Sequence, residues 1–306
     1  MRRGVDIARR RWYNRCMGQS VRLRAFAKAN LSLNITGKNK DNGLHELDSV
    51  MLSLDAFDTV TVTERSDDKI NVRFVNADIG EDNTAAKAAR AVQSAIGGGW
   101  DITVEKGIPI GAGLGGSSAD GAVVLRALDV MYKLPARGVD MRNVALSVGS
   151  DVPFMLTGGL ARVRGTGEDL FFIENKAELF IVGLMSGEVS TARAYAEFDR
   201  LHESGAFCPT DNDKLCELLL SGDPSAVELA GNALYTPACE LAPQIQKNAE
   251  LLKSHGAAVN LTGSGGMVLG YFTDIQKFAA CARALGGMQG FYVFAPTRTG
   301  ILHERL

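Results

Sequence analysis

The sequence lacks the paired cysteines that would cross-link a small secreted protein or bind zinc. Its five cysteines are an odd number, scattered along the chain, and none forms a C-x-x-C pair. They are Cys16, Cys208, Cys216, Cys239 and Cys281. This usage argues against a disulfide scaffold and against a zinc site, and it predicts free thiols in a reducing, cytoplasmic compartment.

The sequence also lacks a basic excess and a long apolar run. Lys and Arg number 33 against 35 Asp and Glu, which gives a net charge of −2 at pH 7. Proteins that bind nucleic acids or anionic membranes need a basic excess. No segment approaches the roughly 18 apolar residues of a membrane span. We therefore expect neither a nucleic-acid nor a membrane partner, and we leave the oligomeric state open between monomer and homodimer.

The first sixteen residues differ from the rest of the chain. Residues 1–16 hold six arginines and one acidic residue. They have neither the apolar core of a secretory signal nor the serine enrichment of an organellar transit peptide. We expect a poorly ordered basic extension before a folded part that begins near Met17.

The 306 residues are enough for two domains, and 46% hydrophobic residues supply their cores. Alternating or β-branched runs predict strands at 21–35, 59–63, 70–75, 102–104, 160–163, 179–182, 267–272 and 291–294. Helical periodicity and caps predict helices at 84–96, 119–133, 139–147, 191–200, 213–220, 224–234, 241–255 and 275–285. Strands and helices mix without regular βαβ alternation, so we predict an α+β fold in two halves that meet near residue 165.

A glycine-rich stretch separates the strand at 102–104 from the helix that follows it. Its glycines permit positive φ and let a ligand approach the main chain closely. The start of the helix adds unpaired N–H groups and a partial positive charge, which suit a phosphate. The sequence therefore predicts a phosphate-binding loop formed by Pro109, Gly111, Gly113, Leu114, Gly115, Gly116, Ser117 and Ser118.

Other interpretations of this loop were compared with the phosphate site. Gly111, Gly113 and Gly116 also match the dinucleotide pattern G-x-G-x-x-G, but the second strand ending in an acidic residue is absent. The Walker pattern fails because Ser117 stands at the position of its lysine. A turn that only lets strand and helix pack closely remains an alternative.

The order of several motifs resembles one superfamily. Residues 109–119, PIGAGLGGSSA, resemble the P-x3-G-L-G-S-S-A loop of the GHMP kinases. Within that superfamily, residues 27–33 and 43–51 are similar to the branch that serves the non-mevalonate isoprenoid pathway. Further matches to that branch lie at 82–84, 149–154 and 261–266. Collinear motifs are far more specific than any one of them.

The resemblance implies a fold and a reaction. It implies a ribosomal-S5-like N-terminal domain at 17–165 and a ferredoxin-like C-terminal domain at 166–306, with ATP and substrate meeting in the cleft between them. It also implies that ATP, with Mg²⁺, phosphorylates the 2-position hydroxyl of the methylerythritol part of a cytidine-diphosphate substrate.

The resemblance assigns the catalytic groups as well. Asp151, in the bend between Gly149 and Pro153, matches the catalytic aspartate, and Lys28 matches the catalytic lysine. Transfer of a phosphoryl group to an alcohol needs a carboxylate that accepts the proton and a cation that stabilises the transferring group. Taken alone, Asp151 equally suits a capping carboxylate, and Lys28 equally suits a solvated edge lysine.

The binding roles come from the same resemblance. It implies that Asn83 binds ATP, that Ser118 is a ligand of Mg²⁺, and that Asn30 contacts the substrate. A second glycine cluster, Thr262, Gly263, Ser264 and Gly265, is a tight loop when taken alone. Beside the first loop it would flank a polyphosphate from the opposite side.

The resemblance places the cytosine of the substrate beside His45 and Tyr195. Leu44 departs from the family, because it stands where the relatives have an aromatic stacking residue. Leu44 keeps open another GHMP small-molecule kinase, such as homoserine kinase. A non-catalytic ligand sensor of the same fold would need the loop without the acid and the lysine. A dinucleotide-binding oxidoreductase is the most distant alternative.

Overall fold

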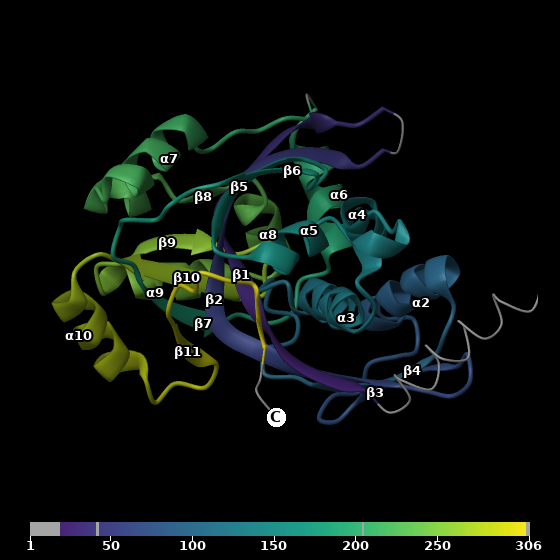
Figure 1. Cartoon of the computed structure of the whole chain (residues 1–306). Helices are drawn as coiled ribbons and strands as arrows, with labels where there is room; N and C mark the ends of the chain where they lie inside the picture. Colours follow the sequence, from purple (N-terminus) through teal and green to yellow (C-terminus); the bar gives the residue numbers. More distant parts are fainter. Residues whose placement is uncertain (1–18, 41–42, 204, 304–306) are drawn as a thin grey trace, which may run out of the picture.

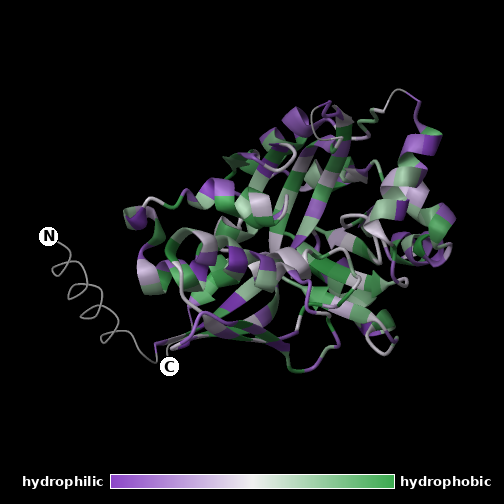
Figure 2. Cartoon of the chain, turned by 90° about the vertical axis from the view of Figure 1, so that its right-hand side faces the viewer, coloured by the Kyte–Doolittle hydropathy of each residue, from purple (hydrophilic) through white to green (hydrophobic). Residues whose placement is uncertain are grey.

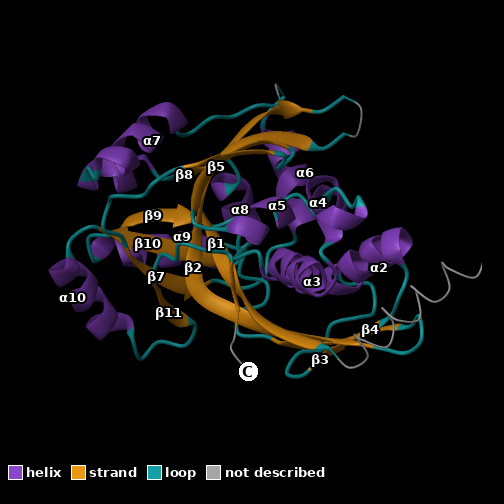
Figure 3. Ribbon diagram, in the orientation of Figure 1, coloured by secondary structure: helices purple, strands orange, loops and turns teal. Residues whose placement is uncertain are grey.

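The structure is a computed structural model that describes residues 19–40, 43–203 and 205–303. The basic extension predicted at 1–16 lies outside these residues. The described part of the chain consists of two β-sheets with helices packed against them (Figures 1 and 3). The predicted α+β class is confirmed.

A long antiparallel pair of strands organises the molecule. β1 (Ser20–Lys38) and β2 (His45–Glu64) pair along nearly their whole length, with register shifts such as the one at Phe26/Ala27. Figure 1 shows this pair curving through the middle of the molecule, between the second sheet and α3. The sequence predicted only 59–63 as a strand in the region of β2. Its first part holds polar residues whose partners lie far away in the chain, so the alternation is hidden.

The large sheet has the order β12-β1-β2-β4-β3, with β5 and β8 pairing with β2 and β1 and β6 pairing with β5. Its other strands are β3 (Ile70–Phe74), β4 (Trp100–Glu105), β5 (Leu160–Gly165), β6 (Asp169–Phe172), β8 (Gly231–Asn232) and β12 (Ile301–His303). The last described strand, β12, therefore returns to pair with the first one. The domain boundary near 165 stays a prediction.

Helices cover one face of the large sheet. They are α2 (Thr84–Ile96), α3 (Gly116–Tyr132), the 3-10 turn η1 (Leu134–Arg137), α4 (Met141–Val148) and α5 (Val152–Thr157). Residues from α2, α3 and the strands form one hydrophobic core. Figure 2 shows hydrophobic residues alternating with hydrophilic ones along the strands and the helices. This packing fixes the start of α3, where the glycine-rich loop ends.

The second sheet is antiparallel, in the order β11-β7-β10-β9. Its strands are β7 (Phe180–Met185), β9 (Ala258–Leu261), β10 (Met267–Phe272) and β11 (Phe291–Phe294). The helices of this half are α6 (Thr191–Leu201), α7 (Asn212–Ser221), α8 (Tyr235–Leu241), α9 (Gln244–Ser254) and α10 (Ile275–Leu285). Along the chain the order is β7, helices, β9, β10, α10 and β11, whereas in the sheet the first and third of these strands are the central neighbours. This arrangement agrees with the expected ferredoxin-like half.

One helix prediction in this half is wrong, and another has a different start. The helix predicted at 224–234 is a 3-10 turn, η2 (Pro224–Leu229), followed by β8. The amide of Asn232 in β8 donates to the carbonyls of Leu261 and Gly263, a long-range pairing that the local pattern does not reveal. The helix predicted at 241–255 occurs as α9 and begins three residues later, after Pro243, because proline cannot continue a helix that precedes it. The preceding helix α8, which ends at Leu241, was not predicted.

Among the described residues, no helix combines the length and the apolar character that a membrane crossing requires.

Candidate active site

The glycine-rich loop joins β4 to α3 and is held in one shape by its neighbours. Gly113 and Gly115 have φ of +76° and +73°. A Cβ on Gly113 would collide with the carbonyl oxygen of Thr262, and one on Gly115 would collide with the end of Met155. Gly115 caps α3 without any side-chain hydrogen bond to the first amides of the helix. These N–H groups are therefore available to an anion.

The start of a second helix lies beside this loop. The Asn83 carboxamide oxygen caps α2 by accepting from the Ala86 amide at 2.9 Å. The hydroxyls of Thr84 and Ser117 are in contact, so the first turns of α2 and α3 meet. Because each helix N-terminus carries a partial positive charge, the two together favour a bound phosphate.

A cavity of about 170 Å³ opens between these two helix starts. The predicted loop residues Pro109, Gly111, Gly113, Leu114, Gly115, Gly116 and Ser117 line it, together with Asn83 and Thr84. The remaining wall is largely apolar, formed by Phe74, Ile79, Ile108 and Ile110. One cavity thus offers main-chain donors at one part and an apolar surface at another, a combination that suits a nucleotide.

A buried charge cluster that the sequence did not reveal connects the start of the glycine-rich loop to α3. The Lys106 ammonium pairs with Asp58 and, at 2.8 Å, with Asp120. One Asp58 oxygen also accepts from the amides of Gly107 and Ile108. The entry of the loop is thus tied to the first turns of α3.

The ionisation of this cluster reflects its burial. Burial raises the pKa of Asp120 to about 7, and the carboxylate of Asp58 adds to that effect while Lys106 opposes it. Burial alone would lower the pKa of Lys106, but the charges of Asp120 and Asp58 outweigh it and raise the pKa. One oxygen of Asp120 has no hydrogen-bond partner in the described part of the chain, and Asp120 lines the cavity between the two helix starts.

Lys28 and Asp151 are brought together beside the loop. The Lys28 side chain is only 4% exposed, and its ammonium lies 3.7 Å from the Asp151 carboxylate. Lys28 also donates to the Asn30 carboxamide oxygen at 2.7 Å, and its main-chain amide donates to the Leu114 carbonyl in the loop. Lys28 is therefore not a solvated edge lysine.

Asp151 is placed by a short helix that the sequence did not predict. It is the residue before α5, in which Pro153 occupies the first turn. Among the described residues, the Asp151 carboxylate makes no capping hydrogen bond. The carboxylate is held in position by backbone geometry while its oxygens remain available to a ligand.

Asn30 links the second glycine cluster to Lys28. Its carboxamide oxygen accepts from the Gly263 amide at 3.0 Å as well as from Lys28, and its amide nitrogen donates to Ser49 at 2.8 Å. Asn30 is fully buried. The structure shows it as a brace for Lys28, and its contact with a substrate stays a prediction.

The second glycine cluster packs directly on the first. The Thr262 hydroxyl donates to the Gly113 carbonyl at 3.2 Å, and a Cβ on Gly266 would collide with the Gly111 carbonyl. The hydroxyls of Ser264 and Thr191 lie 2.8 Å apart, which connects the cluster to the start of α6. The two glycine loops are thus in direct contact, and the predicted role of the second cluster in binding, including that of Gly265, stays a prediction.

The rings of His45 and Tyr195 stack on each other, and their predicted contact with a cytosine stays a prediction. Their ring centroids lie 4.7 Å apart, at an interplanar angle of 27°. Burial, with a contribution from the nearby charge of Asp151, raises the pKa of Tyr195. The Leu44 side chain is 50% exposed. Because the charge of Asp151 acts on Tyr195, the aromatic pair lies near the Lys28–Asp151 pair.

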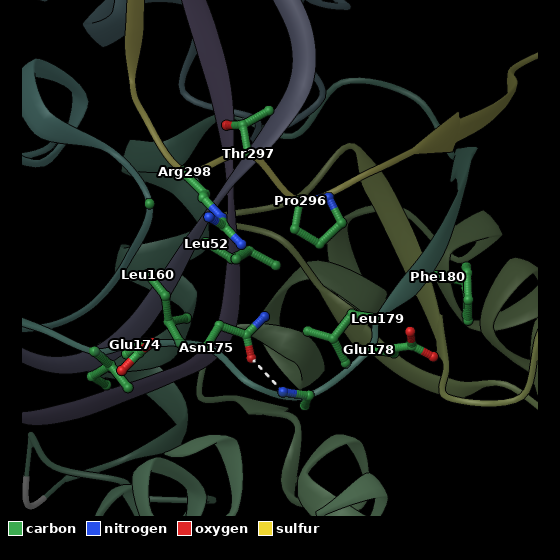
Figure 4. Close-up of a pocket in the computed structure, with 13 residues that line it drawn as sticks. Leu52, Leu160, Glu174, Asn175, Glu178, Leu179, Phe180, Pro296, Thr297 and Arg298 are labelled. Atoms are coloured by element: carbon green, nitrogen blue, oxygen red, sulfur yellow. Dashed lines mark hydrogen bonds between the residues drawn. The ribbon is translucent and has the colours of Figure 1, made fainter. Parts of the chain in front are cut away.

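A larger cavity, of about 480 Å³, involves neither glycine loop. It lies between the two segments that connect the sheets, 173–180 and 296–298, with Leu52 and Leu160 between them (Figure 4). None of the site residues predicted from the sequence lines it. Volume alone would point to this cavity, whereas the catalytic groups and the anion-binding helix starts point to the smaller one.

The chain is similar to known proteins over most of its length. Residues 83–159 match the domain family described as GHMP kinases N terminal domain. The chain is 33% identical over 272 residues to the 4-diphosphocytidyl-2-C-methyl-D-erythritol kinase of Chlorobium chlorochromatii, covering 87% of this chain and 93% of that protein. It is 36% identical over 276 residues to the kinase of the same name from Desulfitobacterium hafniense, covering 86% and 92%.

Solved structures give the same picture. A 4-(cytidine 5'-diphospho)-2C-methyl-D-erythritol kinase superposes with a TM-score of 0.73 at 28% identity, over 90% of this chain and 98% of that one. A homoserine kinase from Cytophaga hutchinsonii superposes with a TM-score of 0.70 at 17% identity, over 93% and 97%. The second likeness shows the fold alone.

Proposed function

The chain belongs to the 4-diphosphocytidyl-2-C-methyl-D-erythritol kinases, within the GHMP kinases, and from that premise we propose which of its residues carry out the reaction. The protein is an ATP-dependent small-molecule kinase of the non-mevalonate isoprenoid pathway. As its substrate we propose the cytidine-diphosphate derivative of methylerythritol, phosphorylated on the 2-position hydroxyl. The observation that carries this proposal is the Lys28–Asp151 pair beside the glycine loop.

ATP binds in the smaller cavity. Its phosphates accept from the free main-chain amides at the start of α3, and the partial positive charge at the start of α2 adds to the attraction. The apolar wall at Phe74, Ile79 and Ile110 takes the adenine ring. Asn83 then acts through the helix start that it caps.

Asp151 and Lys28 divide the chemical work. The oxygen of the acceptor hydroxyl attacks the γ-phosphorus of ATP, a new P–O bond forms, and the bond between that phosphorus and the ADP oxygen breaks. Asp151 accepts the proton that the hydroxyl loses. The Lys28 ammonium, fixed by Asn30 and 3.7 Å from the Asp151 carboxylate, stabilises the negative charge on the transferring group.

Mg²⁺, which ATP chemistry implies, fits the oxygen donors at the start of α3, which are the Ser118 hydroxyl and the phosphates of ATP. Among the described residues, no group of three or more His, Cys, Asp or Glu could hold a metal by itself. Mg²⁺ suits such a place, because it retains several waters and binds through phosphates with one or two protein oxygens. Ser118, at the start of α3, is the proposed protein ligand, and the ion would neutralise phosphate charge.

The substrate occupies the part of the site formed by the second glycine cluster, α6 and the start of β2. The loop at 262–265 contacts the phosphate loop and flanks the diphosphate, while His45 and Tyr195 bind the cytosine.

The four cysteines among the described residues are all unpaired, which supports the cytoplasm as the compartment.

A coupled ADP-release assay tests the proposed function. We expect turnover with the cytidine-diphosphate substrate and none with homoserine at the same concentration. Comparable turnover with homoserine would contradict the proposed substrate. Tight ATP binding without turnover of either compound would indicate a ligand sensor in place of an enzyme.

A further inference from the structure

Three side chains form a line at the edge of the proposed base site. The His45 imidazole Nε2 lies 2.7 Å from one oxygen of Asp199, and the Lys38 ammonium lies 3.0 Å from the other. Asp199 comes from α6, whereas His45 and Lys38 are partners in the β1–β2 pair. No motif singles out Asp199, which is 154 residues from His45.

The contact with Asp199 decides which nitrogen of His45 carries the proton. Partial burial works against the ionised form of Asp199, but the hydrogen bonds from His45 and Lys38 outweigh it and hold its pKa below the ordinary value. An ionised carboxylate can only accept hydrogen bonds. The Nε2 atom of His45 must therefore donate, and in the neutral ring Nδ1 is left as an acceptor.

The Nδ1 atom is open to a ligand. It makes no hydrogen bond within the described part of the chain, and it is not among the buried polar atoms without a partner there. One face of the ring is covered by Tyr195, and the Phe198 ring meets it edge-on at a centroid distance of 5.9 Å. His45 thus offers its edge to the base, since one face is already occupied.

We propose that Asp199 is a positioning residue that fixes His45 as a hydrogen-bond acceptor and thereby selects an amino pyrimidine over a keto pyrimidine. The 4-amino group of cytosine donates to such an acceptor, whereas the 4-carbonyl of uracil would set two acceptors against each other. A site built for one hydrogen-bond pattern rejects the wrong partner strongly, because its polar atom is left unpaired. This inference rests on the proposed function, which places the base beside His45.

The first test compares the cytidine substrate with its uridine counterpart in Asp199→Asn. The neutral carboxamide can accept or donate, so it no longer imposes one tautomer on His45. We expect the ratio of kcat/KM for the two substrates to fall at least tenfold, with the KM for ATP unchanged. Glu197→Gln removes another hydrogen-bonded carboxylate of α6 and should leave the ratio as it is. A ratio that stays within twofold in Asp199→Asn would overturn the proposal.

The second test needs no turnover. Long-range ¹H–¹⁵N spectra report which ring nitrogens of a histidine are protonated, and His45→Gln identifies the His45 signal among the four histidines. We expect a proton on Nε2 alone in the parent protein and a mixture of tautomers in Asp199→Asn. A proton on Nδ1 in the parent would refute the role of Asp199. If the cytidine substrate is not phosphorylated, the proposed function fails, and these spectra still decide how Asp199 acts on His45.

Discussion

At the scale of single residues, the ammonium of Lys28 is a nearly buried charge with two oxygen partners on one side. Asn30 accepts its hydrogen bond at 2.7 Å and Asp151 balances its charge at 3.7 Å. The longer distance to Asp151 leaves that carboxylate free to take a hydrogen bond from a ligand. An acid held in this way can accept a proton without first breaking a tight ion pair.

The first prediction concerns this pair. Asp151→Asn removes the proton acceptor and should lower kcat by about 10²–10⁴-fold. Lys28→Met, which retains the buried stem, should lower kcat by a comparable factor because the charge on the transferring group loses its cation. We expect little change in melting temperature for Asp151→Asn, since its side chain is 29% exposed. Coupled kinetics and thermal melts measure both quantities.

An exposed carboxylate provides the control for this pair. Glu217→Gln, on α7, should retain both kcat and melting temperature, because its side chain is 68% exposed. Near-normal kcat in Asp151→Asn or in Lys28→Met would show that the variant residue does not act in the reaction.

The second prediction concerns pH. Burial opposes ionisation of Asp48, but hydrogen bonds from Arg162 and Asn212 outweigh it and lower the pKa of Asp48. A carboxylate whose pKa is lower in the folded state stabilises the protein above its ordinary pKa, and this contribution is lost as pH falls. Asp48→Asn should therefore cost about 1–3 kcal/mol near pH 7.

The difference in unfolding free energy between the parent and Asp48→Asn should begin to shrink as pH falls to the ordinary aspartate value of about 3.9. It should continue to shrink as pH falls through the lower pKa of the folded state. Denaturant titrations at several pH values measure it. A difference that does not depend on pH would mean that Asp48 does not contribute through its charge.

The order of the motifs was enough to predict Lys28 and Asp151 as site residues. The alternatives of a solvated lysine and a capping carboxylate were excluded only by the burial of Lys28, its distance to Asp151 and the absence of a capping hydrogen bond from Asp151 among the described residues. Asp199 and the cluster of Lys106, Asp58 and Asp120 could not be predicted. Their partners are 14 to 161 residues away in the chain, and single carboxylates on strands and helices are usually solvated. No local signal distinguishes such residues from surface charges.

At the scale of elements, two glycine loops from different halves of the chain press against each other. The close approach depends on backbones without side chains, because the Gly113 and Gly266 Cα atoms face carbonyl oxygens of the opposite loop. The loop between β4 and α3 is therefore shaped by tertiary contact as well as by its own sequence.

The third prediction tests this packing. Gly113→Ala should raise the KM for ATP and destabilise the fold, because its Cβ would collide with the Thr262 carbonyl. Gly138→Ala is the matched control: its φ is +81°, and among the described residues no atom lies within 4 Å of the added Cβ. The control should cost only about 1 kcal/mol and retain the KM for ATP. An unchanged KM in Gly113→Ala would contradict the assigned role of the loop.

Strong local patterns predicted elements well. The helix at 84–96, the strand at 267–272 and the helix at 275–285 occur with the predicted bounds. Short elements were missed, above all α5, because six residues beginning with Val152-Pro153 carry no periodicity. The strand β12 was also missed, since three residues form a strand there only because β1 supplies the partner.

At the scale of the whole molecule, the site draws on both sheets. Lys28 and Asn30 come from β1, the phosphate loop follows β4, and the second glycine cluster precedes β10. The resemblance predicted this two-part arrangement. The local sequence could not have done so, because the contacts that unite the halves, such as Asn30 with Gly263, join residues 233 positions apart.

The fourth prediction is that ATP with Mg²⁺ stabilises the folded protein and NADH does not. A ligand at one hundred times its Kd adds about 2.7 kcal/mol to the free energy of unfolding. Thermal melts measure the effect, and Asp151→Asn should retain it because that change affects chemistry more than nucleotide binding. Stabilisation by NADH would revive the dinucleotide interpretation of the loop.

The most direct measurement is a structure with a non-hydrolysable ATP analogue and the cytidine-diphosphate substrate bound together. We expect the triphosphate against the main-chain amides of 109–118 and the acceptor hydroxyl within about 2.6–3.2 Å of an Asp151 oxygen. A nucleotide bound elsewhere, or an Asp151 carboxylate that faces away from the acceptor hydroxyl, would contradict the account.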